Sequence, residues 1–203
     1  MKLLKKVSAL EVKRAFVTAQ NIKLARAKGK KYLPKLERKE YLKKVVEAKS
    51  KVRKFTEKQL DAFISDEYKK RLVAYDGADW YRAKASVSEL GVWRRAGGLP
   101  AKWTCCPLRE TAEFVRKGMA INSKQIKARS KRAIPRIMDL KDIILKEACL
   151  YPIVFQNKTG TCGRKYCRTN VKGDIDDGCM RSIALAVFGI KTLNIYFGKP
   201  KKA

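Results

Sequence analysis

Residues 180–197 read MRSIALAVFGIKTLNIYF, and they include the longest apolar run of the chain. The run extends over 182–190, stops at Lys191 and resumes over 192–197. It is too short to cross a bilayer, so we expect no transmembrane segment. The pattern predicts a helix at about 180–188 and a strand at 194–197, and residues 151–155 predict a second strand. These elements together predict a small α+β unit over 151–203.

Upstream of this unit the spacing of apolar residues is helical. Ser8 and Glu11 have the spacing of a capping box, and Thr56 is a suitable N-cap residue for a later helix. The residues after the Asp76-Gly77 turn predict one or two short helices, and Ala96-Gly-Gly-Leu-Pro100 predicts a joint. The expected helices are 9–28, 36–55, 56–73, 80–93, 108–119 and 137–150.

These patterns predict a mainly α fold with a small C-terminal α+β unit and a basic helical N-terminal region. The expected organisation is a basic helical N-terminal extension over 1–55, a helical core over 56–150 and a small Cys-containing α+β unit over 151–203. The chain has 203 residues, and at this length one core-bearing domain with basic appendages is the simplest arrangement.

The dominant chemical feature is positive charge. The chain has 49 Lys and Arg against 19 Asp and Glu, a formal net charge of +30, yet 45 % of its residues are hydrophobic. That hydrophobic content is typical of a folded protein and not of a disordered basic tail. Because such a charge repels itself, we expect a partner that carries the opposite charge.

The cations gather in two zones. Residues 1–54 hold 19 Lys and Arg against four acids, and residues 114–138 hold eight basic residues and no acid. Basic helices of this kind bind phosphate backbone without sequence specificity, whereas the alternative is a solvated helix face. The predicted nucleic-acid-binding residues are Lys28, Lys30, Lys31, Lys43, Lys44, Arg53, Lys54, Arg94, Arg95, Lys124, Lys127, Arg129, Lys131, Arg132 and Arg136.

Tryptophans stand beside several of these cations. Trp80, Trp93 and Trp103 each have Lys or Arg within two positions. Rings so placed can stack on unpaired bases, although packing in the core is the simpler use of each.

Histidine is absent from the chain. This excludes Ser–His and Cys–His nucleophiles, His-ligated zinc and imidazole acid–base catalysis. The densest acidic group is Asp174, Asp176 and Asp177, which we interpret as a turn that caps the next helix. The alternative, a divalent cation held for nuclease-type chemistry, is what an enzyme of this sequence would need. We expect no catalytic residues and no enzyme activity.

Six cysteines are present, at positions 105, 106, 149, 162, 167 and 179. Cys162, Cys167 and Cys179 are weak candidate zinc ligands, because a single four-residue gap only partly matches the paired spacing of cysteine zinc sites. Free thiols and disulfides are the alternatives. We therefore expect no cofactor, with zinc as the alternative.

Together these features predict a non-enzymatic structural component of a large nucleoprotein assembly, either ribosomal-protein-like or internal to a virion. Its expected partners are RNA or DNA and neighbouring proteins, with no small-molecule substrate. The alternative is a viral minor capsid or cementing protein that binds other proteins and is disulfide-linked. The N-terminus lacks the apolar segment of a secretory signal peptide, and the sequence does not indicate a compartment.

Overall fold

The computed structural model describes residues 1–27, 38–104, 106–156 and 171–201. The helices are α1 (Ala9–Ala27), α2 (Arg38–Arg53), α3 (Glu57–Phe63), α4 (Asp66–Asp76), α5 (Ala101–Thr104), α6 (Leu108–Ala120), α7 (Ala128–Asp139) and α8 (Cys179–Val187), with the helical turns η1 (Val87–Glu89), η2 (Ala96–Gly98) and η3 (Ile143–Glu147). The strands are β1 (Lys2–Val7), β2 (Ala78–Ser86), β3 (Leu90–Gly91), β4 (Ile153–Gln156), β5 (Gly173–Asp177) and β6 (Thr192–Pro200).

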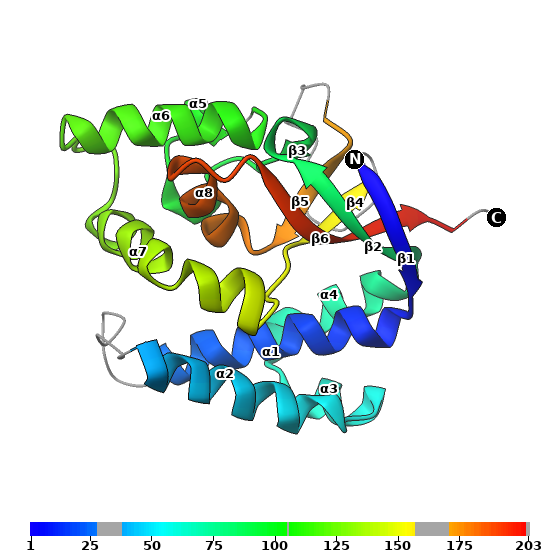
Figure 1. Cartoon of the computed structure of the whole chain (residues 1–203). Coiled ribbons are helices and arrows are strands. Elements are labelled where there is room, and N and C mark those ends of the chain that lie inside the picture. The colour runs from blue at the N-terminus through cyan, green and yellow to red at the C-terminus, as the bar shows by residue number, and fades with distance from the viewer. Residues whose placement is uncertain (28–37, 105, 157–170, 202–203) are drawn as a thin grey trace.

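The strands form one six-stranded mixed sheet in the order β1-β2-β6-β4-β5-β3 (Figure 1). β2 is antiparallel to β1 and β6, β4 is parallel to β6 and antiparallel to β5, and β3 is parallel to β5. The predicted mainly α class is therefore wrong, and the fold is α/β. Strands from all three predicted segments share this sheet, and the predicted domain limits stay a prediction.

The two faces of the sheet pack against different helices, although α1 and α2 contribute residues to both cores. In β6, Leu193, Ile195 and Phe197 belong to a core that includes residues of α6, α7 and α8. The intervening Tyr196 belongs to a second core with residues of α1, α3 and α4. Side chains alternate along a strand, so one strand serves both cores. In Figure 1 these two groups of helices lie on opposite sides of the sheet.

Several predicted helices are confirmed with small shifts at their ends. The predicted helices 9–28, 36–55, 108–119 and 180–188 correspond to α1, α2, α6 and α8, although residues 28, 36 and 37 lie outside the described residues. Thr56 caps α3 as predicted: its Oγ1 accepts from Gln59 N at 3.4 Å, and Gln59 Oε1 accepts from Thr56 N at 2.8 Å. The continuous helix predicted to follow is interrupted, because Ile64 is extended before α4 begins.

Three local predictions are wrong for identifiable reasons. The helices predicted over 80–93 are mainly strand β2, in which Trp80 and Ala83 pack on opposite faces of the sheet. Alanine and lysine favour helices, but pairing with the neighbouring strands overrides that preference. The N-terminal residues are strand β1, not part of a helical region. The single helix predicted over 137–150 is replaced by the end of α7, which continues through Pro135, and by the π-helical turn η3.

Candidate functional site

α2 presents part of the predicted cationic surface. Tyr41, Val45, Ala48 and Val52 of this helix are buried, and their helical spacing leaves its other side to the lysines and arginines. Of the four predicted residues here, Lys43, Arg53 and Lys54 are exposed, and Lys44 Nζ lies 3.1 Å from Glu40 in an ion pair. Lys28, Lys30 and Lys31 lie outside the described residues.

The second zone of cations folds against a glycine turn from an earlier part of the chain. Ser130 Oγ donates to Gly97 O at 2.9 Å, which fixes the first turn of α7 to η2. A Cβ at Gly98 would lie 3.4 Å from Lys127 Cδ and 3.5 Å from Arg129 Nη2. Arg94 and Arg95 directly precede the turn and are exposed, as are Lys127 and Arg129. We call Arg94, Arg95, Lys127 and Arg129 the turn cluster.

The turn cluster is poor in acidic neighbours. Across the described ranges, no carboxylate oxygen lies within 4 Å of the cationic nitrogens of Arg95, Lys127 or Arg129. Lys124 is exposed nearby, without such a carboxylate in the same ranges. Trp93, next to Arg94, is 39 % exposed, whereas Trp80 and Trp103 are 1 % and 9 % exposed and belong to the two cores.

The remaining predicted cations of α7 have local partners. Lys131 Nζ donates to Asn122 O at 2.9 Å. Arg136 Nη1 lies 3.9 Å from Asp139 Oδ2, and Arg132 is exposed. The structure does not bring Arg53 and Lys54 to the turn cluster: Tyr41, early in α2, lies near α7, and Arg53 is about 18 Å further along the helix.

The acidic group is placed differently from the prediction. Asp174, Asp176 and Asp177 are buried in β5, so the predicted turn and helix cap is wrong, and Gly178 precedes α8 in its place. Asp176 Oδ2 accepts from Arg71 Nη2 at 2.7 Å and from Tyr75 Oη at 2.8 Å. The strand pairs with β4 and β3, which explains why this Gly-flanked acidic segment is extended.

The contacts around Asp176 suit a structural ion pair better than acid–base chemistry. Burial lowers the pKa of Arg71, but the charge and hydrogen bond of Asp176, together with the charges of Tyr75 and Asp177, raise it above its ordinary value, so the guanidinium stays charged. Burial and the negative charge of Asp176 raise the pKa of Tyr75 well above its usual value, so the phenol stays protonated. Arg71 has no local signal in the sequence, because Asp176 lies 105 positions away.

Asp177 anchors a second arginine. Its Oδ1 accepts from Gln20 Nε2 at 2.8 Å, and its Oδ2 lies 3.1 Å from Arg181 Nη2. The i,i+4 spacing of Asp177 and Arg181 is a signal that the sequence offers for this contact. The side chain of Arg181 is only 12 % exposed, and it lines a pocket.

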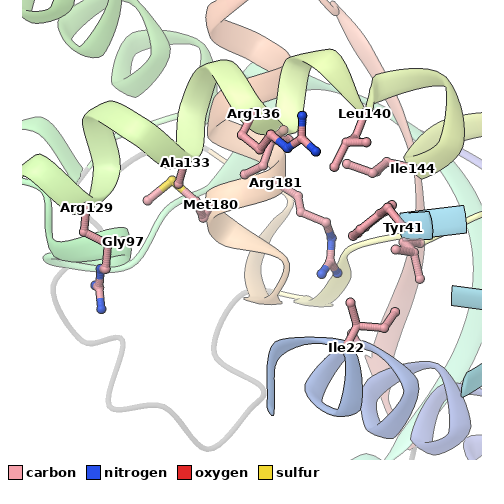
Figure 2. A pocket seen from close by; sticks show the side chains of 13 residues that line it. Ile22, Tyr41, Gly97, Arg129, Ala133, Arg136, Leu140, Ile144, Met180 and Arg181 are labelled. Carbon is pink, nitrogen blue, oxygen red and sulfur yellow. The ribbon is translucent and has the colours of Figure 1, made fainter. Parts of the chain in front are cut away.

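This pocket of about 280 Å³ lies between α1, α2, α7 and the start of α8 (Figure 2). Figure 2 shows Arg136, Leu140 and Ile144 on one side of it and Ile22 and Tyr41 on another. Its walls are mostly aliphatic, with arginines at three places. The pocket is lined by Ala19, Ile22, Tyr41, Gly97, Arg129, Ala133, Arg136, Ile137, Leu140, Ile144, Leu150, Met180 and Arg181.

The candidate zinc ligands are only partly described. Cys179 is buried and its Sγ donates to Ile175 O at 3.3 Å, while Cys162 and Cys167 lie outside the described residues. Cys106, Cys149 and Cys179 are not paired in disulfides within the described residues. Within the part of the chain that the structure describes, no three Cys, Asp or Glu side chains are grouped as metal ligands would be.

Comparison with known protein families, with curated proteins and with solved structures returned no match for this chain. Among the helices within the described ranges, none is both long and apolar enough to cross a membrane.

Proposed function

We propose that the protein is a non-enzymatic structural component of a nucleoprotein assembly that binds phosphate backbone without sequence specificity. The observation that supports this proposal is the turn cluster, where exposed Lys127 and Arg129 lie against Gly98, a few positions after exposed Arg94 and Arg95. Arg95, Lys127 and Arg129 have no carboxylate within 4 Å among the described residues, so an external anion is their natural partner.

The chemistry of the cluster favours phosphate. Arg forms paired hydrogen bonds with phosphate oxygens, and Lys adds a compact charge. Each phosphate that is neutralised releases counterions, which makes binding steeply dependent on salt. The exposed ring of Trp93 next to Arg94 offers a stacking surface for an unpaired base, so we favour a single strand over duplex nucleic acid.

The test is a titration of nuclease-treated protein against single-stranded RNA, duplex DNA and an acidic polypeptide at two salt concentrations. We expect tight binding to RNA, with a salt slope steeper than that of the acidic polypeptide. Comparable weak binding to all three would contradict the proposal and favour a capsid or cementing role through protein contacts.

A further inference from the structure

The pocket between α1, α2, α7 and α8 has walls that suit an apolar molecule. Ile22, Ile137, Leu140, Ile144, Leu150 and Met180 line it. Arg129 is exposed and Tyr41 is buried, so the pocket extends from the surface toward the core. An apolar body placed there would be removed from water, which is the main source of affinity in such sites.

The lining of the pocket also includes cationic groups. Arg129, Arg136 and Arg181 line the pocket, and a guanidinium only donates hydrogen bonds. The Nη2 of Arg181 is engaged by Asp177, but its buried Nε has no hydrogen-bond partner within the described residues. A buried donor of this kind calls for an acceptor.

The donors and walls select the class of ligand. Apart from the hydroxyl of Tyr41, the side chains that line the pocket offer hydrogen-bond donors and no strong acceptor. A nucleobase, which needs both donors and acceptors, is poorly served there, whereas a carboxylate accepts from arginine through two oxygens. The ligand should therefore combine one carboxylate with an aliphatic body.

The volume of the pocket limits the length of the aliphatic part of the ligand. An apolar cavity of about 150 Å³ accommodates benzene, which has six carbons. The pocket of about 280 Å³ is nearly twice as large. We propose that this pocket binds an aliphatic carboxylate of about 8–12 carbons, with its head at Arg136 and Arg181 and its chain against Ile137, Leu140 and Ile144.

The test uses calorimetric titration of the full chain with decanoate, below its micelle concentration. Butyrate serves as a probe of the head alone, and decanol as a probe of the body alone. We expect one decanoate per chain, binding of butyrate weaker by about a thousandfold or more because it lacks six methylenes that decanoate would bury, and weaker binding of decanol.

Variants separate the pocket from the basic surface. R136Q should weaken decanoate binding about tenfold, because it removes a charged hydrogen-bond donor from the wall. A133L should weaken it at least as much by filling the pocket, and it is expected to keep the fold because leucine favours helices. R132Q, on the same helix but not in the pocket lining, should change the affinity less than twofold.

Decanoate binding that is unchanged in both R136Q and A133L would overturn the proposal, as would an equal loss in R132Q. Absence of measurable decanoate binding to the folded wild type would also overturn it. The outcome does not depend on nucleic-acid binding, because the probes carry no phosphate and RNA binding is measured separately.

Discussion

The carboxylate of Asp176 has no exposed surface, and it joins β5 to α4 through Arg71 and Tyr75. A charge buried in this way is tolerated because its partners supply the hydrogen bonds that water would supply. Each member of the group therefore depends on the others. The group acts as a structural cross-link between the sheet and the helical layer.

Replacing Asp176 with Asn should lower the free energy of unfolding by about 3 kcal/mol, because it leaves the half-buried guanidinium of Arg71 without its counter-charge. Urea unfolding measures the loss. The matched control is D66N, whose carboxylate is 93 % exposed and pairs with Lys69 at the surface. A loss in D176N no larger than that in D66N would contradict this role of Asp176.

Glu89 gives the stability a dependence on pH. Burial raises its pKa, but hydrogen bonds from Lys172, the Met1 amine and the Ser86 backbone together hold it at about 2. Because the folded pKa lies below the ordinary value of 4.5, the ionised form stabilises the fold above about pH 4.5, and this contribution is lost as the pH falls toward 2.

E89Q should therefore cost about 1–2 kcal/mol at pH 7. The difference in urea midpoint between E89Q and the wild type should shrink steadily between pH 4.5 and pH 2.5. A difference that stays constant over this range would show that the pKa of Glu89 is not lowered by folding.

At the scale of single elements, glycines permit close packing inside the sheet. A Cβ at Gly173 would lie 2.4 Å from Phe155 O and 2.9 Å from side-chain atoms of Phe197 and Val154. These atoms belong to β4 and β6. The backbone oxygen of Phe155 cannot move without disturbing the pairing of β4 with its neighbouring strands. β5 therefore requires a residue without a side chain at its first position.

G173A should destabilise the protein by about 2–3 kcal/mol. G77A is its control: the nearest atom to an added Cβ there is Ala74 O at 3.5 Å, and the φ of Gly77 is −75°. We expect G77A to be neutral or to stabilise by a few tenths of a kcal/mol. Thermal unfolding of the two variants under identical conditions checks the contrast, and equal losses would argue against it.

The helices were more predictable than the strands. α6 and α8 repeat apolar residues at helical spacing, and the cap at Thr56 depends on neighbouring residues alone. β1 exposes most of its side chains and β5 carries three acids, so neither has the apolar alternation of a strand. Their extended form comes from pairing with β2, β4 and β3, which are distant in the sequence.

The candidate site, like the fold, could be predicted from the sequence only in part. The cations of α2 and α7 were predicted from composition, because segments rich in Lys and Arg and poor in acids are visible in the sequence. The contact of Ser130 with Gly97, which positions the turn cluster, joins residues 33 positions apart. The pocket likewise depends on the packing of four helices, and no local pattern encodes such packing.

At the scale of the whole molecule, the N-terminal segment is built into the fold. β1 pairs with β2 at the edge of the sheet, and Val12, Phe16 and Val17 of α1 are at most 1 % exposed. The N-terminal helices therefore contribute to stability as well as to charge. This arrangement leads to a test of the predicted boundary at residue 55.

A chain that begins at Thr56 should lose its cooperative unfolding transition, because the second core loses the α1 side chains that cover one face of the sheet. Calorimetry and near-ultraviolet circular dichroism measure this. A truncated chain with a sharp transition close to that of the wild type would instead establish residues 1–55 as an independent extension.

The central claim is that the turn cluster binds phosphate, and the salt dependence of RNA binding tests it most directly. The double variant K127Q/R129Q is compared with K6Q/K69Q, which loses the same charge from lysines already paired with Asp79 at 3.1 Å and Asp66 at 2.6 Å. K127Q/R129Q should reduce the slope of log K against log salt by about 1.4, at about 0.7 per lost phosphate contact, while K6Q/K69Q leaves it nearly unchanged. Equal slopes for the two variants would contradict the claim.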